Sequence, residues 1–592
     1  MNRDSIDKKY QWDLSKIYGS LDEFRNDISS VKDKLPKFSK FRDVKYDEEN
    51  LYELMELCMS VSRVLDKLQA YTSLLCDEDT SINRNQELKE EVSNLCSECS
   101  KATYFIDADI LKLDYAYIEE LYKKNSKLLD YELYFKELFR YKEHTLSNEE
   151  EKLLANLSLT FGNNYETYEL LKDSDMTFPN FMVGSEDYEL DNSKYSLYIE
   201  SDNREVRKRA FETLYDTYKS FKNVFASLIT SNIKEEVAMA KIKKYNSSIE
   251  ASMYHDELDL SIYNNLLGTV NERMSVLHKY YDLKKKVLGV DELHLYDVYA
   301  NLVSLDNFKY SFDKAREIVV NALSVLGDEY VSILKEGLSN RWIDVYPNRG
   351  KRTGGYSSGS YDTDPYILLN YQDKYDDMST LAHELGHSIH SYYTRHNNPY
   401  QYGHYSIFVA EVASTVNELL LAKYVIKNSN DKNEKLFILN RMMELFRATI
   451  YRQTMFAEFE KNIYNMIEDG KPVTADILSD EYYRLNEIYF GKNVCVDDDV
   501  RYEWERIPHF FYNFYVYKYA TGLSAACYIV TSLLDGKITS EDYISFLKCG
   551  KSKGPLDSLK VAGVDLSDKS VISSAIDMFD GIIDEFNKLY FE

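Results

Sequence analysis

The chain has 592 residues, 44% of them hydrophobic, and a formal net charge of −27 at pH 7. It contains no run of about 18 or more apolar residues that could span a bilayer, and its acidity repels phosphate backbones, so neither a membrane protein nor a nucleic-acid-binding protein is expected. The N-terminal segment has no apolar stretch followed by a small-residue cleavage site, and we therefore expect a cytoplasmic location.

Long amphipathic helices are predicted over residues 20–160 and 205–340. Only 8 prolines and 21 glycines interrupt the chain, and apolar residues recur at helical spacing between charged ones. One stripe in residues 47–75 is expected to face the core. It comprises Leu51, Leu54, Met55, Cys58, Val61 and Leu65. The fold class predicted from this pattern is mainly α-helical.

The seven cysteines are an odd number spread thinly over the chain, which is not typical of a disulfide framework. Cys96 and Cys99 have CxxC spacing, but no second pair lies nearby and the surrounding pattern is helical. We interpret them as half-buried thiols on a helix instead of a redox or zinc site.

Two segments interrupt the helical pattern. Residues 175–200 lose the helical period and predict a small β-containing insert, which places a domain boundary between residues 1–195 and 196–592. Residues 345–372 combine four glycines with two prolines and then alternate as a strand does. This second segment ends just before a cluster of histidines.

The segment "STLAHELGHSIHSYY", residues 379–393, has the spacing of a metal site on a helix. His383 and His387 are four residues apart, so both imidazoles project from one face and can bind one ion. Glu384 lies about 100° round the helix, beside such an ion, where it could accept a proton from metal-activated water. Ser379 is expected to cap the helix, and Gly386 is expected to mark close packing.

A third ligand is expected from a neighbouring helix. His390 does not supply it, and the metzincin pattern is excluded because position 393 is Tyr393 and not histidine. Glu411 lies inside an apolar run, where we expect it to be buried and to need a metal or another partner; a partly solvated polar stripe is the alternative. Glu418 lies on the same face and is a second candidate ligand, or a residue hydrogen-bonded to a ligand imidazole.

Several motifs together resemble oligoendopeptidase F, in the thimet-oligopeptidase family of zinc metallopeptidases. They are "QWDLSKIYGS", "GKRTGGYSSG", "HELGHSIH", "FVAEVAST" and "RIPHFFYNFYVYKYATGLSAA". The resemblance spans nearly the whole chain. It implies a mainly α-helical bowl or clam of the gluzincin type, with a small β element next to the zinc helix and a deep channel that admits only short unfolded peptides. It also implies an N-terminal helical domain over residues 1–195 and a catalytic domain over residues 196–592.

The resemblance assigns one zinc ion per chain to His383, His387 and Glu411. It assigns the role of general base to Glu384. The expected function is that of a zinc-dependent endopeptidase acting on internal bonds of short peptides.

The resemblance further assigns stabilisation of the oxyanion to His509 and to tyrosines near it. If that segment is helical, His509, Tyr512, Val516 and Tyr519 share a face, which favours Tyr512 and Tyr519. Tyr517 remains an alternative.

A peptide-binding strand is expected at the glycine-rich segment. The backbone of Gly354, Gly355 and Tyr356 would pair with an extended peptide as an added strand, which predicts broad sequence tolerance with a limit on length. Two other functions stay open, a non-catalytic zinc-containing peptide-binding protein and a metallo-exopeptidase. The oligomeric state, monomer or homodimer, is also left open.

Overall fold

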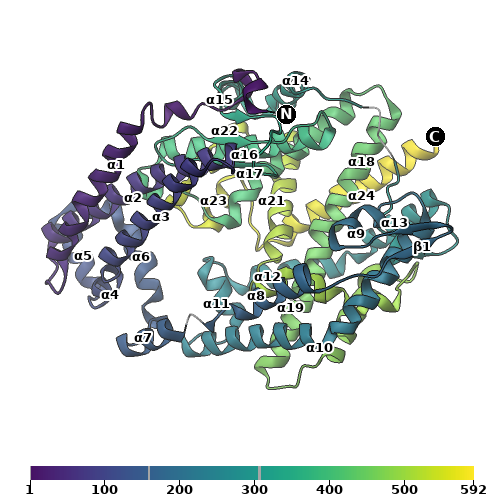
Figure 1. Ribbon diagram of the computed structural model, residues 1–592, viewed down its shortest axis with the longest axis horizontal. Coiled ribbons are helices and arrows are strands. Elements are labelled where there is room, and N and C mark those ends of the chain that lie inside the picture. Colours follow the sequence, from purple (N-terminus) through teal and green to yellow (C-terminus); the bar gives the residue numbers. More distant parts are fainter. Residues whose placement is uncertain (1, 158–159, 304–307) are drawn as a thin grey trace. The chain divides into compact units, whose positions relative to one another are not determined.

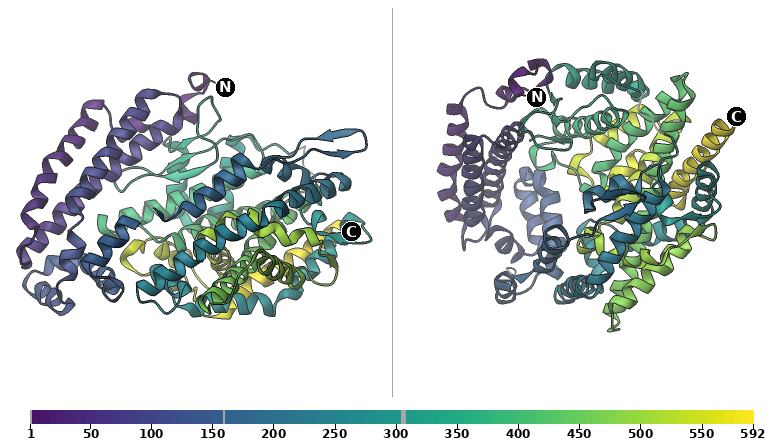
Figure 2. Two further views of the ribbon diagram at one scale, coloured as in Figure 1. Left: turned by 60° about the horizontal axis from the view of Figure 1, so that its bottom comes forward. Right: turned by 45° about the vertical axis from the view of Figure 1, so that its right-hand side comes forward.

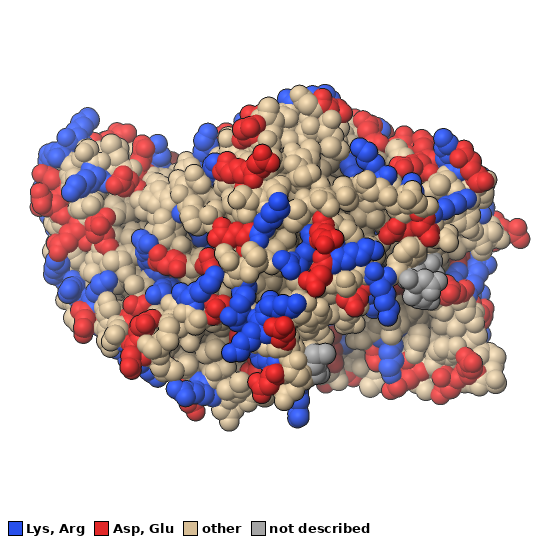
Figure 3. Space-filling model, turned by 90° about the horizontal axis from the view of Figure 1, so that it is seen from above, with Lys and Arg blue, Asp and Glu red and all other residues tan. Residues whose placement is uncertain are grey.

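The computed structural model describes residues 2–157, 160–303 and 308–592, which form a mainly α-helical protein with a few short strands (Figure 1). The predicted fold class is confirmed. In the described part of the chain, no helix is both long enough and apolar enough to cross a bilayer. Basic and acidic side chains are interspersed on the face drawn in Figure 3, so the net negative charge is not gathered there into one patch.

The chain forms two compact units from interleaved segments. The first unit contains Met1–Glu143, Phe308–Leu421 and Ser532–Gly563, and the second contains His144–Asn307, Ala422–Thr531 and Val564–Glu592. The boundary expected between residues 195 and 196 stays a prediction.

The first unit contains most of the N-terminal helices and one small sheet. Its helices are α1 (Leu21–Lys34), α2 (Glu48–Glu78), α3 (Asn83–Thr103), α4 (Ile106–Leu111), α5 (Tyr115–Lys124), α6 (Glu132–Arg140), α14 (Phe312–Ala322), α15 (Gly327–Ser339), α16 (Tyr375–Asn397), α22 (Ser540–Leu547) and α23 (Pro555–Val561). Helix α17 (Ile407–Asn428) begins in the first unit and ends in the second, and α21 (Tyr517–Leu534) does the reverse.

Helix α2 packs against both α1 and α3, and the three lie side by side (Figure 2). The predicted stripe on α2 faces the core, with five of its six members buried and Cys58 half-buried against them. Asp47 caps this helix because its carboxylate accepts hydrogen bonds from the backbone N–H groups of Glu49 and Asn50. Cys96 and Cys99 lie on α3 and are not bonded to each other, in agreement with the interpretation as helix thiols.

Two of the three strands in the sheet of the first unit lie in the glycine-rich segment of residues 345–372, where the sequence predicts strand structure. Its order is β4 (Ile343–Asp344), β6 (Tyr366–Leu368), β5 (Tyr356–Ser358), with β4 parallel and β5 antiparallel to β6. Strand β6 is buried along its length, whereas β5 is an edge strand of this sheet and contacts helix α16. The sheet therefore places an edge beside the helix that carries the histidines.

The second unit is built around α10 (Arg204–Ile242), a helix of 39 residues. Its other helices are α7 (Asn148–Leu157), α8 (Asn163–Leu170), α9 (Asn192–Ile199), α11 (Ser248–His255), α12 (Leu260–Glu272), α13 (Met274–Leu288), α18 (Lys432–Phe446), α19 (Gln453–Glu468), α20 (Ala475–Phe490) and α24 (Lys569–Phe591). The predicted β insert is the hairpin of β1 (Phe181–Val183) and β2 (Glu186–Tyr188). Strands β3 (Leu293–His294) and β7 (Val494–Cys495) pair in parallel.

Candidate metal centre and active site

Helix α16 carries His383, Glu384 and His387. It begins at Tyr375, so the expected start at Ser379 is wrong. The carboxylate of Asp377 accepts a hydrogen bond of 2.9 Å from the backbone N–H of Lys374, and this contact begins the helix one turn earlier. The four-residue spacing brings the two imidazoles together as predicted, with their Nε2 atoms 3.1 Å apart.

Helices α16 and α17 cross closely at Gly386, as the sequence predicts. A Cβ atom at this position would lie 2.6 Å from the Cα of Ser414 and 2.7 Å from the carbonyl oxygen of Ala413. One turn earlier, the side-chain amide of Asn417 on α17 donates to the carbonyl oxygen of Ala382 at 3.0 Å. A side chain at position 386 would push the helices apart, so the glycine allows α17 to present its carboxylates to the histidines.

Glu411 on α17 completes a set of three donor atoms. Its Oε2 lies 3.4 Å from the Nε2 of His383 and 3.6 Å from the Nε2 of His387. Bonds of about 2.0–2.1 Å to a tetrahedral ion place the ligand atoms roughly 3.3 Å apart, so these separations are those of ligands that share one metal. Among the described residues, these three form one of two groups whose atoms could hold a metal ion.

The expectation that Glu411 is buried is wrong. Its side chain is 53% exposed, although Phe408, Val409, Val412 and Ala413 around it are buried. Glu411 lies in the first turns of α17, with its carboxylate directed toward the two imidazoles. The carboxylate of Glu411 is therefore open to solvent.

Glu418 lies two turns further along α17 and contacts the other nitrogen of His383. Its Oε1 is hydrogen-bonded to His383 Nδ1, and it is not part of the three-atom set. If an ion occupies the set, this carboxylate would keep the proton on Nδ1 and leave the lone pair of Nε2 to the ion. Of the two roles left open for Glu418, this geometry favours the partner of a ligand imidazole.

The charges around the two histidines favour a cation between them. Burial alone would lower the pKa of His383, but the carboxylates of Glu411 and Glu418 raise it to about 10. Burial and the charge on His383 lower the pKa of His387 to about 4. His390, the third histidine of the helix, is buried against Tyr405, and burial lowers its pKa to about 3.

Glu384 is buried beside the donor set, with 6% of the residue exposed. Burial raises the pKa of its carboxyl to about 7, and the charge on His383 opposes this rise. The backbone N–H of Ser357 on the edge strand β5 also donates to this carboxylate. A carboxyl group with these surroundings can take up and release a proton near neutral pH.

The glycine segment lies next to this carboxylate. The carbonyl oxygen of Gly354 accepts a hydrogen bond of 2.9 Å from Asn370, and Gly355 lies close to Thr380 on α16. The two glycines line a cavity of about 240 Å³ in the first unit. The hydroxyl of Tyr356 donates to Asp77 at 2.7 Å, and its backbone pairs with Leu368 of β6.

His509 lies in the second unit, in a cluster of aromatic side chains. The Nε2 of His509 and the hydroxyl of Tyr519 are 3.5 Å apart, and the ring of Tyr512 lies 5.6 Å from that of His509. Tyr512 is 42% exposed, and its hydroxyl is hydrogen-bonded to that of Tyr165 at 2.7 Å. Burial lowers the pKa of His509, which keeps its ring neutral at pH 7.

The assumption that residues 509–519 form one helix, on which the choice of Tyr512 and Tyr519 depended, is wrong. A short 3₁₀ turn, η14 (Pro508–Phe511), is followed by a loop, and α21 begins only at Tyr517. In the loop Asn513 and Phe514 have φ values of 37° and 55°, in the left-handed region that interrupts a helix. His509, Tyr512 and Tyr519 nevertheless lie close together.

Two further tyrosines differ in their surroundings. Tyr515, which the sequence does not single out, stacks near His509 and lies with its ring 5.4 Å from that of Tyr519. The three-residue recurrence of His509, Tyr512 and Tyr515 is the only sequence signal for it. Tyr517 is buried, and its hydroxyl lies 3.4 Å from a carboxylate oxygen of Asp256, which is the environment of a core residue.

Comparisons with known proteins place the chain in a family. A model of peptidase family M3 matches residues 197–578, and a model of oligopeptidase F matches residues 109–178. The oligopeptidase PepF of Bacillus subtilis (strain 168) is 40% identical over 591 residues, which cover 99% of this chain and 88% of that protein. An oligoendopeptidase F homolog of Borreliella burgdorferi is 37% identical and covers 100% of both chains.

Solved structures agree with these relatives. The crystal structure of oligoendopeptidase-F from Enterococcus faecium superposes with a TM-score of 0.73 at 31% identity and covers 96% of this chain and 99% of that one. A Chlamydophila abortus protein superposes with a TM-score of 0.94 at 34% identity over 99% of each chain.

A mainly α-helical protein that matches these family models and relatives belongs to the class of metallopeptidases. The chain belongs to peptidase family M3. The resemblance to oligoendopeptidase F is thereby confirmed.

Proposed function

We propose that this metallopeptidase is a zinc-dependent endopeptidase that hydrolyses internal bonds of short, unstructured peptides. The observation that carries the proposal is the convergence of His383 Nε2, His387 Nε2 and Glu411 Oε2, with the carboxyl of Glu384 next to them. A set of three protein donors leaves one corner of a tetrahedral zinc for water, whereas structural zinc usually takes four protein ligands.

The four site residues of the first unit have two roles, metal binding and proton transfer. His383, His387 and Glu411 would hold one zinc ion per chain, which supplies a Lewis acid that lowers the pKa of coordinated water toward 7. Glu384 accepts a proton from the attacking water and delivers it to the amine of the leaving peptide. Because this carboxyl is buried, it exchanges protons with the substrate more readily than with bulk solvent.

The glycine segment is proposed to hold the peptide. Gly354 and Gly355 lead into the edge strand β5, which begins at Tyr356, and an extended peptide could add along this segment through main-chain hydrogen bonds. Main-chain recognition reads no side chains, so the proposal includes broad sequence tolerance.

The aromatic cluster of the second unit is proposed to stabilise the oxyanion. His509 and the hydroxyls of Tyr512 and Tyr519 are hydrogen-bond donors that can be directed at the negative charge that develops on the carbonyl oxygen. Tyr519 is the tyrosine we favour, since its hydroxyl lies beside the imidazole of His509. Tyr517 is a weaker candidate because it is buried and faces Asp256.

The direct test is Glu384→Gln with product mapping. The amide cannot accept a proton, so cleavage of a peptide of about ten residues should fall by roughly 10²–10⁴-fold while bound zinc stays unchanged. Glu317→Gln, at an exposed position on α14, is the matched control and should cleave as the wild type does. Full activity in Glu384→Gln would refute its role as the base.

The same assay separates the two other functions. Mass spectrometry should find cuts at internal bonds, abolished by a chelator. Removal of single terminal residues would indicate an exopeptidase. An intact peptide that remains bound to the zinc-loaded protein would indicate a non-catalytic binding protein.

A further inference from the structure

A second group of metal-binding side chains lies in the second unit, on the short sheet of β3 and β7. The register of this parallel pair sets His294 opposite Cys495. Glu292 precedes His294 by two residues, and residues i and i+2 of an extended chain point to the same side. The donor atoms of Glu292, His294 and Cys495 all lie within 4.8 Å of one another.

The imidazole of His294 is held by a carboxylate on its far side. Its Nδ1 lies 2.8 Å from Asp497 Oδ1, and the other oxygen of Asp497 accepts a hydrogen bond of 2.9 Å from the backbone N–H of Leu295. The ring also stacks on Tyr296, with centroids 4.8 Å apart and an angle of 12° between the planes. Asp497 thus holds a proton on Nδ1, and the Nε2 lone pair is left for a cation, as in carboxylate–histidine–metal arrangements.

The backbone of this histidine is also fixed. The N–H of His294 donates to the buried carboxylate of Asp297 at 3.1 Å. Asp297 in turn pairs with Arg204 at 2.8 Å and Arg207 at 2.7 Å. Lys285 and Arg204 are cations near Cys495, and the charge of Arg204 is compensated by its pair with Asp297.

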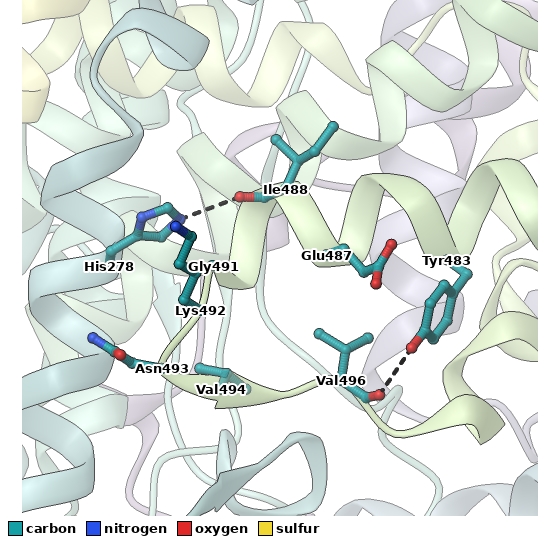
Figure 4. Close-up of a pocket in the computed structure, with 9 residues that line it drawn as sticks. All are labelled: His278, Tyr483, Glu487, Ile488, Gly491, Lys492, Asn493, Val494 and Val496. Atoms are coloured by element: carbon teal, nitrogen blue, oxygen red, sulfur yellow. Dashed lines mark hydrogen bonds between the residues drawn. The ribbon is translucent and has the colours of Figure 1, made fainter.

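The sulfur of Cys495 lies on the same side of the β3–β7 pair as the imidazole of His294. Its neighbours Val494 and Val496 line a cavity of about 710 Å³ together with His278 and Tyr483 (Figure 4). Successive side chains of a strand point to opposite faces, and Cys495 is not among the residues that line the cavity. The thiol is half-buried and unbonded, and it faces the imidazole instead.

An ion pair without metal is the competing explanation for the group. The Nε2 of His294 and the Oε2 of Glu292 are 3.9 Å apart, which is too far for a hydrogen bond but is within reach of two ligands that share one ion. The side chain of Glu292 is 71% exposed and that of His294 24%, so an ion from solvent can reach both.

We propose that Glu292, His294 and Cys495 bind a divalent transition metal ion such as zinc, at a site separate from the catalytic one. Sulfur, imidazole and carboxylate donors together suit zinc or cobalt and not magnesium or calcium. The ion would join residues 292–294 to residue 495, which are distant in the sequence, and would therefore stabilise the folded second unit.

Cobalt spectroscopy tests the site without any measurement of activity. Co²⁺ bound to a thiolate gives a near-ultraviolet charge-transfer band, and the His383, His387, Glu411 set contains no sulfur. We expect the band to saturate at one equivalent of Co²⁺ per chain in a metal-free His383→Ala/His387→Ala variant. In the metal-free wild type, whose proposed catalytic set also binds an ion, the band should saturate by two equivalents. Cys495→Ser should remove the band, and Cys96→Ser, which changes another half-buried cysteine, should leave it in place.

Two further variants keep the test decisive if Cys495→Ser is unstable. His294→Gln should weaken Co²⁺ binding strongly. Asp497→Asn should weaken it by about 10–100-fold, since it removes only the partner of the imidazole. Absence of the charge-transfer band in the wild type, or a band that persists in Cys495→Ser, would overturn the proposal.

Discussion

His383 has a carboxylate on each of its two ring nitrogens. Glu418 binds Nδ1, and Glu411 lies 3.4 Å from Nε2. In the proposed metal site the two contacts have different roles. Glu418 would fix the proton and the orientation of the ring, and Glu411 would bind the same ion as the ring. A substitution of Glu418 alone tests this difference in roles.

Glu418→Gln should weaken zinc binding without removing it. The amide oxygen can still accept a hydrogen bond from Nδ1, but the negative charge that makes the imidazole a better ligand is lost. We expect the dissociation constant for zinc, measured by competition with a chromogenic chelator, to rise by about 10–100-fold. Lys427→Gln, at an exposed position of the same helix, should leave it unchanged. A loss of zinc as complete as that in His383→Ala would mean that Glu418 is itself a ligand.

At this scale the sequence predicted the identities of the neighbouring residues better than their exposure. The spacing of His383 and His387 is a local property of a helix, and the structure brings the two rings together. The exposure of Glu411 depends on which face of α17 meets α16, and that face is set by the contact of Gly386 with Ser414. Such a contact between distant segments is not encoded in the apolar run around Glu411.

At the scale of elements, the loop between η14 and α21 is held by three side chains from other helices. Glu236 accepts a hydrogen bond from the side chain of Asn513, Ser252 donates to the carbonyl oxygen of Asn513, and Glu460 accepts from the backbone N–H of Phe514 at 2.7 Å. These contacts stabilise the left-handed residues Asn513 and Phe514, and they place Tyr512 and Tyr515 beside His509. A sequence pattern of aromatic residues cannot reveal them, which is why the helical interpretation of this segment was wrong.

Glu460 makes the stability of the protein depend on pH. Burial raises the pKa of its carboxyl to about 8, above the value of about 4.3 in an unfolded chain. Between these values the folded state binds one proton more than the unfolded state, so the contribution of Glu460 to the free energy of unfolding falls as pH rises, by up to about 1.4 kcal/mol per pH unit.

Glu460→Gln should remove this dependence, because an amide does not ionise and its oxygen can still accept from Phe514. Thermal unfolding followed by circular dichroism should give similar melting temperatures for wild type and variant at pH 5. The variant should be increasingly more stable toward pH 8. Glu200→Gln, at an exposed position, should follow the wild type throughout. Parallel pH profiles for wild type and Glu460→Gln would mean that the carboxyl of Glu460 is ionised in the folded protein.

The element boundaries show a similar limit of sequence patterns. The helical stripe of α2 and a small β-containing insert in residues 175–200 were predicted because apolar spacing and the loss of the helical period are local signals. The structure forms this insert as the β1–β2 hairpin. The start of α16 was missed because the side chain of Asp377, and not Ser379, caps it.

At the scale of the whole molecule, the chain crosses between two compact units several times. The first unit takes residues from three separate segments, and the donor set of His383, His387 and Glu411 lies entirely within it. His509 and its tyrosines belong to the second unit. Sequence patterns show where the helical periodicity is interrupted. They do not show which segments, distant in the sequence, fold into the same compact unit.

The central claim is that one ion binds to His383, His387 and Glu411, and zinc content measures it most directly. A Cys495→Ser background removes the second proposed site, so that only this set is counted. After dialysis against buffered zinc, elemental analysis should find one zinc per chain in Cys495→Ser and none when His387→Ala and Glu411→Ala are added. Equal zinc content in the two proteins, both folded by circular dichroism, would contradict the claim.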